Sequence, residues 1–428
     1  MQMTRAGTSR LISCLVACLI ACGGGGDDGD TPDAQIDDID GAIATDATPA
    51  PDSAIDSDAG NASRLDMLLA ALRADTAGAL LAQANDEGWP APVEGGYLFV
   101  TSDPNLDRVG GDHDGWQGTS LTPDDGFQWV VLDVPAGNRY KFTNLTDWVG
   151  DPWSRAYEWD QFGLMSMLPP TAAHLERFFA QGAPGLAERT IRVWVPEAPT
   201  SHVLYVHDGQ NLFNPSAIWG GWRLQESAPA GMMIVGIDNT GARFEEYTHT
   251  TDVINGSSYG GQGDAYADFV QDDIRSLIRD HYGEPARVGV MGSSLGGLIS
   301  LHIADRFRGQ YDFAASLSGT VGWGSIGAGV TNQTMIERYD DAGLQSTALY
   351  IDSGGGGTCV DSDGDGIMDD APDGLDNYCE NLQLRDTLVA DGYTFNTDLW
   401  HWYEDGAPHN EAAWAARVWR PLDLFAAL

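Results

Sequence analysis

The sequence predicts an α/β fold, in which a doubly wound, mostly parallel sheet follows a small β-sandwich module. From Arg189 onward, short apolar runs alternate with longer stretches of helical periodicity. This alternation indicates a parallel sheet covered by helices on both faces. Residues 93–168 instead contain short β-type runs separated by Gly, Pro and Asp, a pattern typical of an antiparallel module. The third observation is a Gly-x-Ser-x-Gly motif between an apolar run and a helical stretch, which fits the same fold class.

The elements of the sheet domain, which is expected to span residues 175–428, follow from these patterns. Strands are expected at residues 191–196, 203–207, 232–238, 287–291, 313–318, 348–352 and 394–400. Helices are expected at residues 265–281, 295–307, 380–390 and 411–424. An Asp-rich insert is expected at residues 359–379.

The N-terminus has the pattern of a secreted, lipid-anchored protein. Arg5 and Arg10 precede an apolar run that is too short to remain as a transmembrane helix. Residues 19–23 read Leu-Ile-Ala-Cys-Gly, which resembles the lipobox of bacterial lipoproteins. We therefore expect residues 1–21 to be a signal peptide and Cys22 to carry the lipid. A plain secretory signal, or processing at Cys18, is the alternative.

The charge of the chain is strongly acidic and unevenly distributed. Lys and Arg number 22 against 63 Asp and Glu, a net charge of −41, which disfavours nucleic acid and electrostatic docking on anionic lipid. Residues 23–63 contain eleven Asp and no Lys, Arg or Glu. With few large apolar side chains, residues 22–63 are expected to form a disordered tether. The amphipathic spacing over residues 64–92 predicts a helical segment.

Two cysteines remain after the expected processing. Cys359 and Cys379 form an even pair in an oxidising compartment, so we expect a disulfide. Two buried thiols or a pair of metal ligands are the alternatives.

The Gly-x-Ser-x-Gly motif identifies Ser294 as a candidate nucleophile. Strand and helix patterns on its two sides predict a tight turn that places the hydroxyl at the helix N-terminus. Ser293 does not fit the spacing of the motif.

A serine nucleophile needs a base, and on this fold the base follows the last strand. His409 lies between the last expected strand and the last expected helix. His401, His281 and His302 are the rivals, but their positions in the expected strands and helices fit this role less well.

Several ordered motifs resemble the putative esterase family, which includes feruloyl, acetyl-xylan and enterochelin esterases. They are residues 205–213, 236–239, 243–248, 292–297 and 409–414. The resemblance implies an α/β-hydrolase fold that cleaves carboxylic esters, with the backbone N–H groups of Gln210 and Leu295 as oxyanion donors. Substrate contact or loop packing are equally open for four further residues near strand ends, namely Trp219, Trp222, Asn239 and Arg243.

The acid of the triad is where this sequence departs from the family pattern. Residues 355–358, where relatives carry Asp or Glu, read Gly-Gly-Gly-Thr. Asp352, Asp361 and Asp376 are the candidates, with a preference for Asp352, and a Ser–His dyad without an acid is also open.

The Asp-rich insert resembles a calcium loop. Asp361, Asp363, Asp365 and Asp369 occupy relative positions 1, 3, 5 and 9, and the Ile367 carbonyl falls at position 7. Pro372 stands where an EF-hand has Glu, and Asp373 or Asp376 could complete the shell. We expect a structural Ca²⁺ here, with a solvated acidic loop as the alternative.

Residues 93–168 resemble the early-set sandwich modules of glycogen-handling enzymes. The resemblance rests on residues 111–116, Trp129, residues 140–142 and residues 151–153. It implies carbohydrate contact through aromatic side chains, whereas Trp116, Trp129 and Trp153 as core residues is the favoured interpretation.

Together these features predict a serine carboxylic-ester hydrolase that works through an acyl-enzyme without a catalytic cofactor. We expect it to be lipid-anchored in a bacterial cell envelope and stabilised by calcium. Its expected partners are a small-molecule or glycan-linked ester and, through the sandwich, carbohydrate. An acyltransferase using the same site and a non-catalytic glycan-binding lipoprotein are the alternatives.

Overall fold

The computed structural model describes residues 62–327, 329–370 and 376–428. The signal peptide, Cys22 and almost all of the tether therefore lie outside the described residues. Two compact units are present. The first extends to Arg155 and includes Leu164–Leu168, and the second comprises Ala156–Gly163 and Pro169–Leu428. Within the described residues no helix is both long enough and apolar enough to cross a bilayer.

The first unit begins with two capped helices, α2 (Arg64–Ala74) and α3 (Thr76–Asp86). The side chain of Asp75 accepts the N–H of Gly78 at 3.0 Å and so caps α3. Leu69, Leu72 and Leu80 are buried on one side of the pair, as the apolar spacing predicts.

Two antiparallel sheets complete the first unit. One has the order β1 (Ala91–Val93), β2 (Gly96–Thr101), β6 (Gln128–Leu132) and β5 (Thr122–Pro123). The other has the order β10 (Gly163–Met167), β7 (Arg139–Thr143), β3 (Arg108–Gly111) and β4 (Thr119–Ser120), with β8 (Trp148–Val149) also paired to β7. Phe99 from one sheet and Tyr140 and Phe142 from the other belong to one buried cluster, which is the core of a small sandwich.

The three tryptophans singled out in the sandwich are all partly buried. Trp116, Trp129 and Trp153 each keep some exposed surface, and Trp116 contacts Trp148 with ring centroids 5.8 Å apart. Their assignment to core or to carbohydrate contact stays a prediction.

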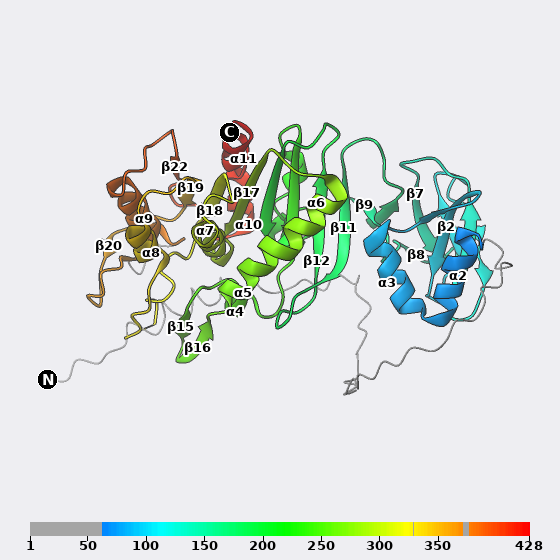
Figure 1. Cartoon of the computed structure of the whole chain (residues 1–428), viewed down its shortest axis with the longest axis horizontal. Helices are drawn as coiled ribbons and strands as arrows, with labels where there is room; N and C mark the ends of the chain where they lie inside the picture. The colour runs from blue at the N-terminus through cyan, green and yellow to red at the C-terminus, as the bar shows by residue number, and fades with distance from the viewer. Residues whose placement is uncertain (1–61, 328, 371–375) are drawn as a thin grey trace, which may run out of the picture. The chain divides into compact units, whose positions relative to one another are not determined.

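The second unit is built on a mostly parallel sheet (Figure 1). Its strands are β9 (Ala156–Asp160), β11 (His174–Gln181), β12 (Arg189–Val195), β13 (His202–His207), β14 (Met232–Ile237), β17 (Arg287–Ser293), β18 (Phe313–Leu317), β19 (Ala348–Ser353) and β22 (Leu399–Tyr403). They lie in the order β22-β19-β18-β17-β13-β14-β12-β11-β9. The pairs from β22 to β14 are parallel, whereas β12, β11 and β9 are antiparallel. The predicted doubly wound, mostly parallel sheet is confirmed.

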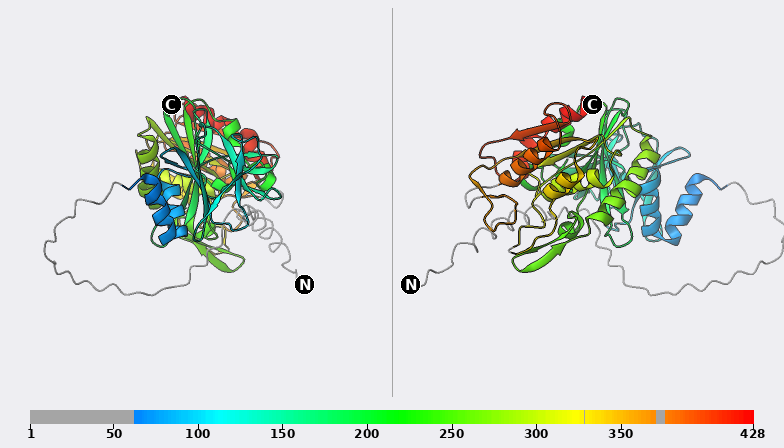
Figure 2. Two further views of the ribbon diagram at one scale, coloured as in Figure 1. Left: turned by 90° about the vertical axis from the view of Figure 1, so that its right-hand side faces the viewer. Right: turned by 60° about the vertical axis from the view of Figure 1, so that its left-hand side comes forward.

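Helices cover both faces of this sheet (Figures 1 and 2). They are α4 (Arg243–Glu246), α5 (Gly263–Asp268), the π-helical η4 (Phe269–Ile274), α6 (Arg275–Tyr282), α7 (Leu295–Arg306), α8 (Met335–Ala342), α9 (Tyr378–Ala390), α10 (Glu411–Arg417) and α11 (Trp419–Ala426). Val288 and Val290 of β17 face the large core that includes α6, α7, α8 and α9. The intervening Gly289 is close to Phe425 of α11, because successive strand residues point to opposite faces.

Three predicted elements differ clearly from the structure. The helix expected at residues 265–281 contains the π-helical η4 between α5 and α6. The last strand begins at Leu399 rather than at residue 394, because Asp398 accepts the N–H of Thr394 at 2.6 Å and closes a turn there. The last predicted helix is divided at Val418 into α10 and α11. Pro421, which lacks an N–H, lies in the first turn of α11, where a proline is tolerated.

Candidate active site

Ser294 lies in the tight turn between β17 and α7. Its φ of 55° is in the left-handed region, which is strained for a non-glycine residue. A Cβ on Gly292 would lie 2.5 Å from the backbone of Gly296, and a Cβ on Gly297 would lie 2.5 Å from Ser316 Oγ. Gly292 is therefore required by close backbone packing. A Cβ on Gly296, the second glycine of the motif, would lie 3.2 Å from Asp208 Oδ2, and Gly297 directly follows the motif. Ser293 is the last residue of β17.

The Ser294 hydroxyl is buried and has no hydrogen bond to any described residue. A buried hydroxyl without a hydrogen-bond partner lowers the stability of the fold. A contribution to stability therefore does not explain why a serine occupies position 294. The backbone around the serine is well anchored, since Ser294 N–H donates to Leu317 O at 2.9 Å and Thr320 N–H donates to Ser294 O at 3.2 Å.

His409 forms a buried pair with Asp376. His409 Nδ1 is 2.6 Å from Asp376 Oδ1, and the carboxylate is fully buried. The edge of the ring packs against Trp414, with centroids 4.9 Å apart. With Nδ1–H donated to the carboxylate, Nε2 carries the lone pair of the neutral ring and is the atom available as a base.

The serine and the His–Asp pair share neighbours at the end of β18. Ser318, which follows Leu317, donates its hydroxyl to Asp376 Oδ2 at 2.6 Å. Asn377 Nδ2 donates to Thr320 Oγ1 at 3.2 Å, and Thr320 is bonded to Ser294. The structure thus brings together residues from β17, β18, the segment before α9 and the segment before α10.

The preference for Asp352 as the triad acid is wrong for this geometry. Asp352 is buried in β19 and forms two hydrogen bonds with Arg417, both of 3.0 Å. Its Oδ2 also accepts the Tyr350 hydroxyl at 2.9 Å, and burial raises its pKa despite the Arg417 charge. The carboxylate that contacts His409 is that of Asp376, one of the alternatives, while Asp361 lies in a separate exposed cluster.

The rival histidines have other surroundings. His302 is fully buried in α7, and burial, assisted by the Arg338 charge, lowers its pKa to about 3. His401 lies in β22, where burial lowers its pKa to about 4. His281 is exposed on α6, and its Nδ1 is 2.9 Å from Leu277 O.

The expected oxyanion donors lie at the starts of two helical turns. Leu295 is the first residue of α7, whose initial N–H groups have no acceptor within the helix. Gln210 lies in η1 (Gly209–Asn211), directly after β13 and after Asp208, which has a φ of 61°. A Cβ on Gly209 would lie 2.6 Å from Asp238 Oδ1, so only glycine allows this turn to approach β14 so closely.

Asn239 and Arg243 hold the Gln210 turn. Arg243 Nε and Nη2 donate to the two oxygens of Asp208 at 2.7 and 2.8 Å. Asn239 donates to Asp208 Oδ1 at 2.6 Å, and its N–H donates to Gln210 Oε1 at 3.1 Å. Arg243 is only 3% exposed, so these contacts fit the loop-packing interpretation of both residues.

The two tryptophans proposed for substrate contact differ from each other. Trp222 is buried and packs on Trp414, with ring centroids 6.1 Å apart. Trp219, in η2 (Ile218–Gly220), is 62% exposed and has a φ of 55°. The helical turn η2 contacts α10, the helix that follows His409. Because Trp219 is exposed and Trp222 is buried, Trp219 is the tryptophan of this pair that a ligand can reach.

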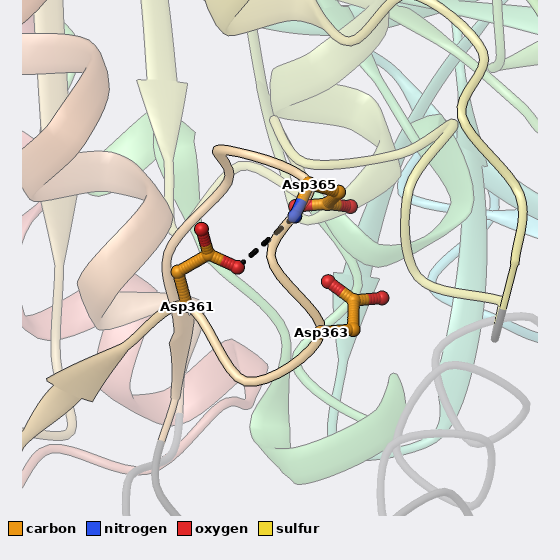
Figure 3. A group of neighbouring side chains, drawn as sticks. All are labelled: Asp361, Asp363 and Asp365. Atoms are coloured by element: carbon orange, nitrogen blue, oxygen red, sulfur yellow. Dashed lines mark hydrogen bonds between the residues drawn. The ribbon is translucent and has the colours of Figure 1, made fainter.

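Three of the five expected calcium ligands converge in the acidic insert (Figure 3). One carboxylate oxygen from each of Asp361, Asp363 and Asp365 lies within 4.8 Å of the others. The small burial of Asp363 and the negative charges around it, that of Asp365 first, raise its pKa. Asp369 is not part of this group, and its carboxylate accepts the N–H and the hydroxyl of Ser362. The N–H of Ile367 donates to Asp365 Oδ1 at 2.8 Å.

The structure contains the expected disulfide between Cys359 and Cys379, with Cα atoms 5.3 Å apart. The bond joins β20 (Cys359–Val360) to the first turn of α9. Asp376 and Asn377 directly precede α9, with φ values of 75° and 56°. The disulfide therefore closes a loop that contains both the acidic cluster and the partner of His409.

This fold, a mostly parallel sheet with a Gly-x-Ser-x-Gly turn between β17 and α7, is that of an α/β-hydrolase. Residues 187–422 match the model of the family described as putative esterase, and the chain belongs to that family. It is a carboxylic ester hydrolase.

Comparison with known proteins gives remote structural similarity besides this family match. No curated protein matches the chain. An enterobactin esterase from Shigella flexneri, solved with 2,3-dihydroxy-N-benzoyl-glycine, is 15% identical with a TM-score of 0.43, covering 77% of this chain and 93% of its own. An IroE-like serine hydrolase from Shewanella oneidensis is 18% identical with a TM-score of 0.45, covering 59% and 80%. A siderophore hydrolase from Aspergillus nidulans is 17% identical with a TM-score of 0.41, covering 59% and 94%.

Proposed function

We propose that the protein is a serine esterase that forms an acyl-enzyme on Ser294, with His409 as the base and Asp376 as the residue that orients it. The observation that carries this proposal is the contact between His409 Nδ1 and Asp376 Oδ1. Asp376 accepts the hydroxyl of Ser318, and Ser294 N–H donates to the O of Leu317, the residue before Ser318. The Ser294 hydroxyl is buried and has no hydrogen bond among the described residues. A triad is recognised by such geometry and not by the order of its members in the sequence.

The proposed reaction begins when Ser294 Oγ attacks the ester carbonyl carbon. The new C–O bond forms as the hydroxyl proton passes to His409 Nε2, and the carbonyl π electrons move to the oxygen. The N–H groups of Gln210 and Leu295 stabilise that oxyanion. Asp376 stabilises the imidazolium without taking its proton.

Collapse of the tetrahedral intermediate breaks the bond to the alcohol oxygen, which leaves with the proton from His409. Water then attacks the acyl-enzyme while His409 takes its proton. A second collapse releases the carboxylic acid and returns Ser294 to its hydroxyl form. No redox change occurs, and the net reaction is ester plus water to acid plus alcohol.

Replacement of the nucleophile tests the mechanism. Ser294→Ala is expected to lower kcat on a short-chain nitrophenyl ester more than about a thousandfold and to abolish labelling by a fluorophosphonate. Ser293→Ala, one residue earlier in β17, is the matched control and should still be labelled. Retained turnover or labelling of Ser294→Ala, with an unchanged circular dichroism spectrum, would refute the assignment.

The substrate is proposed only as a class, a small-molecule or glycan-linked carboxylic ester. The exposed indole of Trp219 supports an apolar or ring-containing group beside the ester, because η2 contacts α10, the helix that follows His409, and an aromatic ring offers a large contact area. Carbohydrate contact through the sandwich is proposed as a further means of reaching glycan-linked esters.

We also propose a lipid anchor at Cys22, a location in the bacterial cell envelope and a structural Ca²⁺ in the acidic insert. The lipobox-like sequence supports the anchor and the location. The convergence of Asp361, Asp363 and Asp365 supports calcium, because oxygen ligands of this kind bind Ca²⁺.

A further inference from the structure

A buried hydrogen-bonded network lies behind the His409–Asp376 pair. Arg417 of α10 donates to both oxygens of Asp352 and, through Nη2, to Ser318 Oγ at 2.7 Å. Ser318 in turn donates to Asp376 Oδ2 at 2.6 Å. Asp352, Arg417, Ser318 and Asp376 are each at most 3% exposed, so this network is shielded from water.

The hydroxyl proton of Ser318 has only one direction left. A serine hydroxyl has two lone pairs and one proton. Arg417 Nη2 and Trp414 Nε1, at 2.7 and 3.0 Å, donate to the oxygen and occupy both lone pairs. The proton is therefore directed to Asp376 Oδ2, which also accepts the N–H of Gly354. Oδ2 is held by two donors, and Oδ1 faces His409.

The positive charge of Arg417 is balanced mainly by Asp352 and not by Asp376, the residue that contacts His409. Burial works against the charge of Arg417, but the carboxylate of Asp352 outweighs it and the pKa of Arg417 is raised. Arg417 forms its two close ion-pair bonds with Asp352 and approaches Asp376 Oδ2 only to 3.5 Å. The charge of Asp376 therefore remains largely available to stabilise an imidazolium at His409.

We propose that Ser318 and Arg417 are positioning residues of the esterase reaction, and that Asp352 is the counter-ion that lets a buried Arg417 serve this role. They act by fixing the rotation of the Asp376 carboxylate, so that Oδ1 stays on His409 Nδ1. The proposal rests on the proposed function, because it requires Ser294 and His409 to be the reacting groups.

Ser318→Ala tests the positioning directly. The variant removes the donor to Asp376 while filling nearly the same volume, and loss of one hydrogen bond to a buried carboxylate should lower kcat about tenfold or more. KM should stay within about twofold, because Ser318 is fully buried and its hydroxyl is bonded to Asp376, Trp414 and Arg417. The substitution should change the tautomer and the orientation of His409 and leave substrate binding unchanged.

A pair of charge variants gives a second, independent readout. Charged or titratable groups near the pair are Asp352 and Tyr350 of β19, Glu411 and Arg417 of α10 and Arg420 of α11. Asp352→Asn leaves Arg417 uncompensated, which should lower the apparent pKa of the acid limb of kcat/KM by about half a unit or more. Arg417→Gln removes the positive charge and should raise the apparent pKa of the acid limb. The double variant should return the limb toward the wild-type value.

Controls separate positioning from stability. Asp305→Asn, in a buried ion pair with Arg338 of α8, should lower the melting temperature without moving the acid limb. If Arg417→Gln does not fold, Ser318→Ala and Asp352→Asn decide the question by themselves.

The proposal is overturned if Ser318→Ala keeps kcat within twofold and Asp352→Asn leaves the acid limb unmoved or raises it. Failure of the proposed function would be seen differently, as continued fluorophosphonate labelling of Ser294→Ala or no labelling of the wild-type protein.

Discussion

Two buried aspartates lie near the proposed base, and only one of them contacts it. Asp352 lies near the end of β19, where the sequence predicts the acid, but its side chain contacts Arg417. Asp376 reaches His409 because its backbone adopts a φ of 75° directly before α9. The glycines at 354–357 lengthen the loop, so the position of the acid does not follow from counting residues after the strand. The available signal for the acid was the pair Asp376-Asn377, which directly precedes α9.

Asn239, Arg243 and Ser318 illustrate what single residues gain from packing. Each is polar and lies just beyond a strand end, which makes substrate contact a reasonable hypothesis for the first two. In the structure, Asn239 and Arg243 contact Asp208, and Ser318 contacts Asp376. Their partners come from other segments of the chain, which no local motif specifies.

At the residue scale, Cys22 provides a test of the proposed anchor. Cys22→Ser removes the thiol that would receive the lipid. The variant should move from the membrane fraction to the soluble fraction of expressing cells, because the lipid on Cys22 is the proposed attachment to the membrane. Labelling with a radioactive or clickable fatty acid should be lost as well. A variant that fractionates and labels like the wild type would exclude Cys22 as the anchor.

The disulfide-closed insert is the element that connects structure to the proposed catalytic acid. Its acidic cluster and Asp376 lie within the one loop between Cys359 and Cys379. Three carboxylates so close to one another repel, and a bound Ca²⁺ would relieve that repulsion. Order in the insert and the placement of Asp376 are therefore expected to depend on the same ion.

Removal of calcium should lower both the stability of the protein and its esterase activity. EDTA is expected to lower the melting temperature by several degrees and to reduce kcat, and added Ca²⁺ should restore both. Asp363→Asn should weaken the response to Ca²⁺, whereas Asp280→Asn, at an exposed position on α6, should respond like the wild type. An unchanged melting temperature and an unchanged kcat in EDTA would rule out the structural ion.

The elbow between β17 and α7 is the element that sequence predicts best. The three motif residues, Gly292, Ser294 and Gly296, lie within five consecutive positions, and the requirement for glycine at position 292 is local, as the 2.5 Å approach to the Gly296 backbone shows. The division of the last helix at Val418 and the late start of β22 depend on Pro421 and on the Asp398 turn. Both residues are visible in the sequence, but the apolar periodicity continues past them and predicts one uninterrupted helix and an earlier strand start.

At the scale of the whole molecule, four histidines are held neutral by burial. Burial lowers the pKa of His207 and His302 to about 3 and that of His249 and His401 to about 4. Unfolded histidines titrate near 6.5, so the unfolded chain binds more protons at pH 5. The raised pKa values of Asp352, Asp363 and Asp391 act in the opposite direction. The lowered pKa values of Asp112, Asp114, Asp124 and Asp305 act in the same direction as those of the histidines.

The free energy of unfolding should therefore fall as the pH falls from about 6.5 toward 4. Each of these histidines contributes roughly 2–3 kcal/mol over that interval. Urea unfolding at pH 7 and pH 5 measures the loss, and His401→Gln should make it smaller. His281→Gln, at an exposed histidine, should leave it unchanged. Equal or greater stability at pH 5 would contradict the prediction.

The net charge of −41 is also a property of the whole chain, but it has local causes. Eleven acids lie in residues 23–63 and seven in residues 359–379, the segments proposed as tether and calcium loop. The charge thus marks two segments with separate proposed roles and gives no information on the reaction.

The sequence by itself determined the mostly parallel sheet, the turn at Ser294, the loop that carries His409 and the cysteine pair. Each follows from periodicity, from a short motif or from a count, which are local properties of the chain. Only the tertiary structure decided that Asp376 and not Asp352 meets His409, that Arg243 braces the turn that contains Gln210, and that Ser318 and Arg417 lie next to Asp376. These outcomes depend on side-chain directions where β18, β19, α9 and α10 pack together, and packing between distant segments sets those directions.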